Sequence, residues 1–223
     1  KAIFRSNFAL NSFNFNFGVY NLIYIKKNIN KYKIFLTTIL FISFLTGCFQ
    51  TNMKQFENNT PKLNLFSFFE GDTIAYGIFE DRFGNLKRQF RVNIKGSVDK
   101  EQLTLDEEFL YDDGEQAKRV WKIKKIIDDK KNIVYSGQAD DVEGNASGSI
   151  SGNALNWSYD IFLNIKGSNV KVHFNDWIYQ QSDEIAINRA YVSKFGVNIG
   201  SVTLVFLRGK TATSIGPLNL KNW

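Results

Sequence analysis

From about residue 66 onward, apolar and polar side chains alternate in short runs, and turn residues separate these runs about every ten positions. An alternation of period two is typical of strands that turn one face toward a core. Many short strands at this spacing indicate a sandwich or barrel. We therefore predict an all-β antiparallel domain of about eight to ten strands, near 72–80, 86–97, 102–111, 116–127, 133–139, 146–152, 154–165, 169–179, 184–192 and 200–208.

The pattern also predicts the register of one hairpin. Apolar groups occupy most odd positions of 103–111 and 119–123, and a three-residue loop ending in a left-handed Gly114 is a common connection between such strands. A slip by one residue would place Asp106 against Trp121 and lose the apolar matches. The predicted cross-strand pairs are Leu103–Ile123, Leu105–Trp121, Glu107–Arg119 and Phe109–Ala117. The Glu107–Arg119 pair is interpreted as an ion pair that stabilises the pairing of the two strands. Alternatively, it is a polar group that contacts a ligand in a cavity.

An uncharged apolar run, residues 34–45, precedes the β region and follows a flank of lysines. Its length suits a signal peptide, whereas a spanning helix needs about 20 residues. The run ends at Leu45-Thr46-Gly47-Cys48, which matches the lipobox of bacterial lipoproteins. We expect cleavage before Cys48 and lipid on its thiol; an ordinary transmembrane anchor with an incidental cysteine is the alternative. Phe49, where a retention signal would have Asp, favours the outer membrane.

The chain is therefore divided into five parts. Residues 1–25 are interpreted as sequence upstream of the true start, 26–47 as the signal peptide, so that 1–47 form the leader, and 48–65 as a lipidated tether. Residues 66–210 form the expected barrel domain, and 211–223 form a tail in which Trp223 is expected to have no structural role.

Charge and composition narrow the possible functions. The chain has a net charge of +6, but residues 1–47 hold six basic and no acidic side chains, so the remainder is formally neutral. A neutral domain gives no electrostatic reason to expect nucleic acid as a partner. Cys48 is the only cysteine, which leaves no disulfide.

Enzyme motifs are mostly missing. His173 is the only histidine, and its alternation with Val172 and Phe174 predicts a surface or rim position. The segment 140–145 has the composition of a calcium loop but the wrong ligand spacing, so a turn or bulge is favoured. We predict no catalytic residues, no metal site, no cofactor and a protein that is not an enzyme.

Aromatic residues and the few charges among them supply the candidate binding residues. Asp176, Trp177 and Tyr179 end a predicted strand, where amphipathic rings suit either ligand contact or closure of a barrel end. The full set of candidate cavity or rim residues is Leu105, Glu107, Arg119, Trp121, Trp157, Asp176, Trp177 and Tyr179.

The motifs of this region resemble those of a bacterial lipoprotein family of unknown function, domain of unknown function 3833, over nearly the whole domain. The matching segments are Gly77-Ile-Phe79-Glu-Asp81-Arg82-Phe-Gly84, Glu108-Phe109-Leu-Tyr111-Asp-Asp113-Gly114, Gly137-Gln-Ala139-Asp-Asp141-Val142-Glu-Gly144 and Gly152-Asn153-Ala154-Leu155-Asn-Trp157-Ser-Tyr159. The resemblance implies a lipocalin-like (calycin-type) barrel on a lipid anchor, and it implies no activity.

Our leading hypothesis is a periplasmic lipoprotein, anchored through Cys48 in the outer membrane, whose barrel holds an apolar or lipid-like molecule such as a fatty acid. Small residues crowd 146–152, so that strand is expected to leave room for a ligand. The alternative is a structural lipoprotein whose filled barrel is a docking scaffold for proteins.

Overall fold

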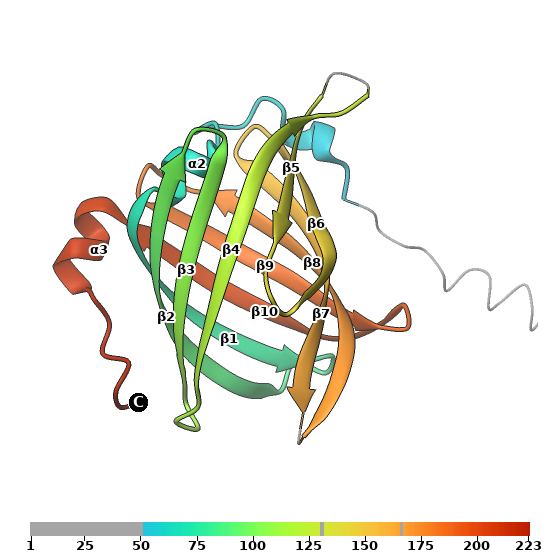
Figure 1. Cartoon of the computed structure of the whole chain (residues 1–223), viewed down its shortest axis with the longest axis vertical. Helices are drawn as coiled ribbons and strands as arrows, with labels where there is room; N and C mark the ends of the chain where they lie inside the picture. Colours follow the sequence, from blue (N-terminus) through green and yellow to red (C-terminus); the bar gives the residue numbers. More distant parts are fainter. Residues whose placement is uncertain (1–50, 130–131, 166) are drawn as a thin grey trace, which may run out of the picture. The chain divides into compact units, whose positions relative to one another are not determined.

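The computed structural model describes residues 51–129, 132–165 and 167–223. The lipobox Leu45-Thr46-Gly47-Cys48 and the rest of the leader lie outside the described residues. Ten antiparallel strands form the described domain (Figure 1). They are β1 (Gly71–Asp81), β2 (Leu86–Asp99), β3 (Gln102–Tyr111), β4 (Gln116–Ile127), β5 (Ile133–Gln138), β6 (Val142–Ser151), β7 (Ala154–Ile165), β8 (Ser168–Gln180), β9 (Ile185–Lys194) and β10 (Val197–Arg208).

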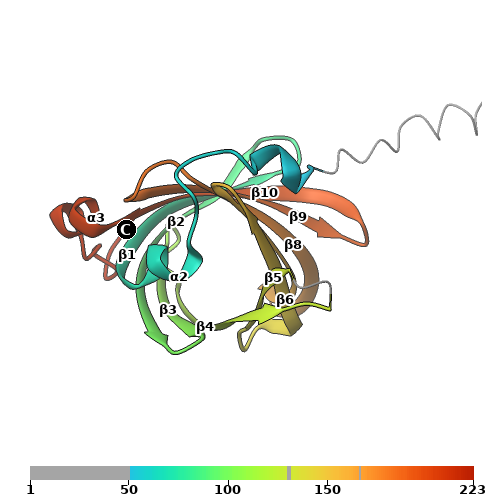
Figure 2. The ribbon, with the colours of Figure 1, turned by 90° about the horizontal axis from the view of Figure 1, so that it is seen from above.

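Each strand pairs with the next along the chain, and β1 pairs with β10 to close the barrel. Figure 2 shows this closed ring from above. The predicted all-β antiparallel barrel is therefore confirmed, with strand number at the upper end of the expected range. Closure leaves no open sheet edge between the first and last strands, because nine residue pairs from Thr73–Arg208 to Asp81–Gly200 join β1 to β10.

The predicted β3–β4 register is confirmed at all four pairs, including Leu105–Trp121 and Glu107–Arg119. Gly114 in the connecting turn has a φ of 84°, the left-handed conformation that the three-residue loop requires. The turn chemistry and the apolar pattern agree here, and together they fix the pairing.

Two strands begin earlier than predicted. The register of β6 shifts between Glu143 and Ser147, and that of β10 shifts between Asn198 and Gly200. A bulge interrupts the alternation of side chains, so the first residues of both strands lack the pattern that identified the others. The segment 140–145 thus contributes a turn and a bulged strand, as predicted.

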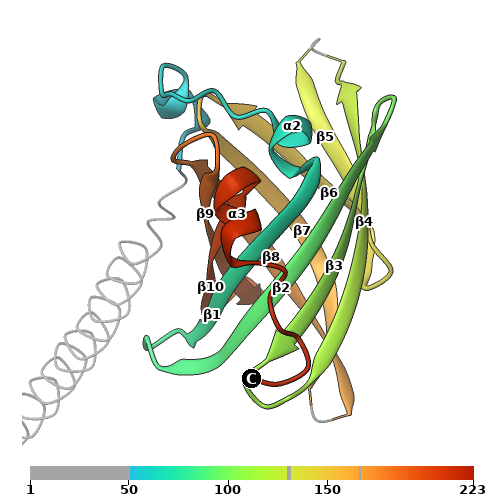
Figure 3. The ribbon, with the colours of Figure 1, turned by 90° about the vertical axis from the view of Figure 1, so that its left-hand side faces the viewer.

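A short helix, α2 (Leu65–Phe69), lies across one end of the barrel (Figures 2 and 3). Its Leu65, Phe68 and Phe69 are almost completely buried, and Phe69 meets Phe206 of β10 edge to face at 5.2 Å. Its backbone lies against β2 so closely that a Cβ on Gly96 would come within 1.7 Å of the Phe69 carbonyl oxygen. The helix therefore covers part of this end of the barrel.

The segment expected to be a tether is instead part of the folded unit from Asn52 onward. A 3-10 turn, η1 (Met53–Phe56), places Phe56 against the rings of Trp177 and Tyr179, with centroids 5.7 and 5.6 Å apart. The Leu63 amide then donates to the Gly152 carbonyl at 2.8 Å. Polar composition suggested a linker, but the few apolar residues of this segment find partners on the barrel.

The expected tail also packs on the barrel. It contains α3 (Gly209–Ile215), which lies along the outside of β1 and β10 (Figure 3). Leu218 is buried, and its amide donates to the Asn93 side chain at 2.9 Å. Arg91 lies over the ring of Trp223 at 4.5 Å, so the expectation that Trp223 has no structural role was wrong. Among the described residues, no helix is long and apolar enough to cross a membrane.

Candidate functional site

The barrel interior holds a cavity of about 540 Å³. Side chains from α2 line one end, and side chains near the β3–β4 turn line the other. On β8 and β9 the lining residues are every second one, as the pleat of a strand requires. These inward-facing residues are Val172, Phe174, Asp176 and Ile178 on β8, and Asn188, Ala190 and Val192 on β9.

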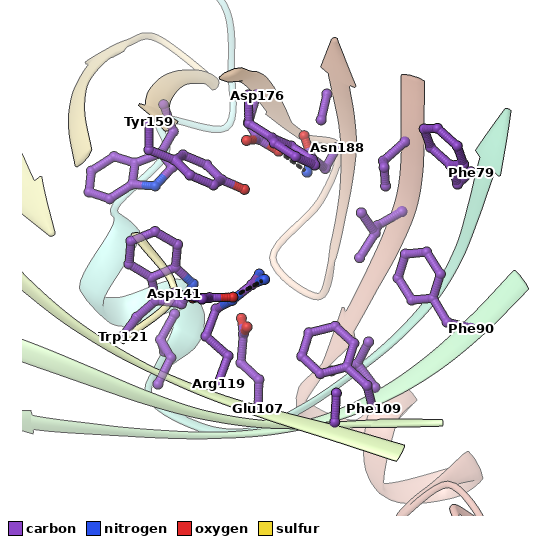
Figure 4. Close-up of a pocket in the computed structure, with 18 of the residues that line it drawn as sticks. Phe79, Phe90, Glu107, Phe109, Arg119, Trp121, Asp141, Tyr159, Asp176 and Asn188 are labelled. Carbon is purple, nitrogen blue, oxygen red and sulfur yellow. Dashed lines mark hydrogen bonds and ion pairs between the residues drawn. The ribbon is translucent and has the colours of Figure 1, made fainter. Parts of the chain in front are cut away.

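Aromatic rings form much of the wall (Figure 4). On one side Trp121, Trp157, Tyr159 and Phe174 form a continuous group in which Trp121 meets Tyr159 at 5.2 Å and Tyr159 stacks on Phe174 at 5.3 Å. On the other side Phe90 contacts Phe109 and Tyr111. The predicted cavity residues Leu105, Trp121 and Trp157 all line this space.

The small residues of β6 do not leave space for a ligand in the way that the sequence suggested. A Cβ on Gly148 would lie 2.3 Å from the Trp157 ring, and a Cβ on Gly137 of β5 would lie 2.5 Å from it. Trp157, on the neighbouring strand β7, fills the room above these glycines. The two glycines therefore provide the space in which the Trp157 ring packs.

Arg119 is held in the cavity wall by Asp141. The Arg119 Nε lies 3.1 and 3.0 Å from the two Asp141 carboxylate oxygens, and its Nη2 lies 2.7 Å from Oδ2. The expected ion pair between Arg119 and Glu107 is not formed, although the two residues are cross-strand neighbours as predicted. Asp141 competes successfully because it offers a bidentate geometry that matches the guanidinium fork.

Glu107 lies beside this pair, and no described residue donates a hydrogen bond to it. It lines the cavity together with Arg119 (Figure 4). Burial raises the pKa of Glu107 to about 7, and the positive charge of Arg119 only partly offsets this effect. The Asp141 and Asp176 carboxylates raise this pKa further by repulsion. Glu107 is therefore a carboxyl that changes its charge near neutral pH.

A second carboxyl, Asp176 of β8, lies deeper in the wall, with 5% of its surface exposed. The Asn188 side-chain amide donates to its Oδ1 at 2.7 Å, whereas Asp176 Oδ2 and Asn188 Oδ1 are buried with no hydrogen-bond partner. Burial raises the pKa of Asp176 to about 6, against the opposing effects of Asn188, the Tyr159 hydroxyl and Arg119. Burial also raises the pKa of Tyr159 well above its usual value, so this phenol keeps its proton.

The end of the cavity opposite α2 is polar. Arg88 pairs with Asp113 at 2.9 Å and with Glu115, and its guanidinium lies 3.5 Å from the centroid of the Tyr111 ring. Glu115 is exposed and also lines the cavity, so the cavity reaches solvent at this end. We call the group Arg88, Tyr111 and Glu115 the mouth.

Two predicted site residues lie elsewhere. Trp177 and Tyr179 alternate with the inward-facing Asp176 and Ile178, so they point to the outer face of the barrel and pack beneath Phe56. They do not line the cavity, because alternation along β8 places them on the face opposite to Asp176. The acid was correctly chosen, but the rings beside it belong to the opposite face.

His173 is on the outer face, as predicted, where its Nδ1 lies 2.7 Å from Asp160 and its Nε2 lies 3.2 Å from the Ser158 hydroxyl. No group of three or more potential metal ligands occurs within the described ranges.

Sequence reasoning missed Asn188, Tyr159 and the role of Asp141. Asn188 had a detectable signal, since it is a polar residue in phase with Ala186, Ala190 and Val192 on an inward face. Asp141 had none, because it lies in a turn and reaches Arg119 across 22 positions of sequence.

A comparison with known structures found ten similar chains, of which two are the following. One is the structure of the S-type phycobiliprotein lyase CpeS from Guillardia theta, with a TM-score of 0.49, 10% identity and coverage of 72% of this chain and 99% of that chain. The other is a de novo designed fluorescence-activating β-barrel, with a TM-score of 0.36, 11% identity and coverage of 66% of this chain and 99% of that chain.

No curated protein matches the sequence. One family model matches residues 42–208, most of the chain, and it covers all ten strands described above. The chain therefore belongs to the family described as "Protein of unknown function (DUF3833)".

Proposed function

We propose that the barrel binds one small, mainly apolar molecule that carries a polar group. The observation that supports this function is the cavity itself, whose volume of about 540 Å³ lies in the range typical of ligand sites. A filled barrel of similar size would bury its side chains against one another. Here the walls are largely aromatic and aliphatic, with a few polar groups that converge from different strands, as in binding sites for organic molecules.

We also propose that the protein is a binding protein rather than an enzyme, and that it is anchored through lipid on Cys48 at the periplasmic face of the outer membrane. The lipobox and the short apolar run before it support the anchor. A lipid anchor would keep the barrel beside a source of apolar molecules.

Native mass spectrometry of the gently purified protein tests the binding function, and a co-purified small molecule is the expected result. Titration with apolar ligands should also change the tryptophan fluorescence, because Trp121 and Trp157 line the cavity. Trp121→Phe should weaken this response, whereas Trp177→Phe, which alters the outer face, should leave it intact.

A cavity-filling variant with a matched control makes the test specific. Val202 lines the cavity, whereas Val205 on the same strand faces outward between the exposed Tyr76 and Ile187. Val202→Phe should weaken binding about tenfold or more by occupying ligand volume, and Val205→Phe should not. If nothing co-purifies, no ligand titrates and both variants behave as the unaltered protein, a binding function is excluded and the docking scaffold becomes the better hypothesis.

A further inference from the structure

The charges that line the cavity do not balance. The charged lining residues are two arginines, Arg88 and Arg119, and four acids, Glu107, Glu115, Asp141 and Asp176. Arg88 pairs with Glu115 at the mouth, and Arg119 pairs with Asp141 in the wall. Glu107 and Asp176 remain without an ion pair, so the interior carries excess negative charge when both ionise.

These two carboxyls act on the same space. Glu107 on β3 and Asp176 on β8 both line the cavity, and the negative charge of Asp176 contributes to the raised pKa of Glu107. Figure 4 shows them on opposite walls, with the Tyr159 hydroxyl next to Asp176 and the Arg119 guanidinium next to Glu107. A positive group in the gap between the two carboxyls would remove the repulsion and compensate for the burial of both carboxylates.

Hydrogen bonding indicates the same missing group. Asp176 Oδ2 and Asn188 Oδ1 are buried and have no donor in hydrogen-bonding geometry, although the protonated Tyr159 hydroxyl faces Asp176 and lowers its pKa. Buried acceptors are costly when unsatisfied, and nearly all such groups in folded proteins have a partner. Asp176, Asn188 and Glu107 all line the cavity, so a bound molecule can bring donors to this region in addition to the Tyr159 hydroxyl.

Other groups around the gap offer little to an anion. Arg119 carries the positive charge near the gap, and two of its three guanidinium nitrogens already bond to Asp141. A ligand carboxylate placed here would lie near the carboxyls of Glu107 and Asp176. The one guanidinium nearby, that of Arg119, is already neutralised by Asp141. The electrostatics therefore disfavour a free fatty acid, the ligand that an apolar barrel first suggests.

We propose that the polar group of the ligand is a protonated amine, or a similar cationic nitrogen, held between Glu107 and Asp176 with its apolar body against the aromatic walls. The proposal rests on the binding function proposed above and specifies the chemical class of the ligand. An ammonium group supplies both the charge and the several donors that the gap lacks.

Three ligands with one apolar body and different head groups test this proposal: dodecylamine, dodecanol and dodecanoate, each below its micelle concentration. Binding is measured near pH 8, where both carboxyls are ionised, by calorimetry and tryptophan fluorescence. Dodecylamine should bind at least about tenfold more tightly than dodecanoate, because an unmatched buried charge weakens association by that factor or more.

The double variant Glu107→Gln, Asp176→Asn keeps the shape of the site and removes both charges. It should abolish most of the preference for the amine while leaving dodecanol binding within about twofold. Asp106→Asn is the matched control, because Asp106 is exposed on the outer face of β3 next to Glu107. It should leave the order of the three affinities unchanged.

The outcomes separate the two proposals. Equal binding of all three ligands, tighter binding of dodecanoate, or an amine preference that survives in the double variant would overturn the cationic ligand and leave a binding function in place. Failure of all three ligands to bind, with no co-purified molecule, would overturn both.

Discussion

Glu107 and Asp176 make the fold less stable when they carry charge. Each has a pKa raised by burial, to about 7 and about 6, so the folded state holds a proton more tightly than the unfolded chain. The protonated form therefore contributes stability that is fully present below the unfolded pKa values near 4 and is lost as the pH rises through about 7. This contribution is on the order of 2–3 kcal/mol for each group.

The double variant Glu107→Gln, Asp176→Asn removes this dependence. Near pH 8 it should unfold at a higher temperature than the unaltered protein, and near pH 4 the difference should shrink, since neither protein then carries charge at these positions. Thermal unfolding followed by circular dichroism at both pH values measures the effect. Asp106→Asn again serves as the control, and a double variant that is less stable near pH 8 would contradict the buried-charge interpretation.

The positions of single side chains were easier to predict than their contacts. Alternation along a strand shows which face of the sheet a side chain occupies, but it does not show which other side chain it contacts. The candidate residues that line the cavity are those that period-two patterns place on one face of their strands: Leu105, Glu107, Arg119, Trp121, Trp157 and Asp176. The pairing of Arg119 with Asp141 was not predictable, because it depends on how the β5–β6 turn folds back toward β4. Trp177 and Tyr179 were misassigned because they were grouped by sequence proximity with a residue of the opposite face.

At the scale of elements, strands were more predictable than the segments that flank them. Regular alternation and turn residues gave the positions of the strands and one register, and the largest departures coincide with the bulges in β6 and β10. The segments that contain η1, α2 and α3 are too short for a helical period to show in the sequence. Their positions come from long-range contacts with a barrel that the local sequence does not contain.

The docking of α2 depends on the missing side chain at Gly96. Gly96→Ala would place a Cβ within 1.7 Å of the Phe69 carbonyl oxygen, a backbone atom that cannot move without shifting the helix. We expect the variant to lose about 1–3 kcal/mol of stability and to release α2 from the end of the barrel. Limited chymotrypsin digestion should then cleave after Phe68 or Phe69, which are buried in the unaltered protein.

Ser97→Ala is the control for this experiment, because Ser97 is the exposed neighbour of Gly96 on β2. It should change neither the stability nor the digestion pattern. A Gly96→Ala protein that resists cleavage at α2 as well as the control does would show that the helix can move without leaving the barrel.

At the scale of the whole molecule, both flanking segments of the described chain reinforce the barrel from outside. Phe56 of η1 covers Trp177 and Tyr179, and the residues after α3 cover Arg91 and Asn93. A membrane anchor would therefore join the folded unit directly, since only residues 49–51 separate Cys48 from it. Those residues span at most about 14 Å between Cys48 and Asn52.

The anchor itself is tested by Cys48→Ala. The variant should lose lipid from its amino terminus and move from the membrane fraction to the soluble fraction, because the acyl chains supply the stable anchoring. Mass spectrometry of the mature terminus and fractionation of cells measure both effects. Ser43→Ala, within the apolar run, leaves the lipobox intact and should behave as the unaltered protein. A Cys48→Ala chain still cleaved at the same place and bound to membranes would refute the anchor.

The position of α2 across one end of the barrel affects the rate at which a bound ligand can exchange. Because α2 covers part of one end and the cavity reaches solvent at the mouth, we expect arrival and departure to share the route through the mouth. A second molecule then cannot enter from the opposite end of the barrel and displace the first. Exchange must proceed by release followed by reloading, so its rate has a ceiling set by spontaneous dissociation, however abundant the incoming molecule is.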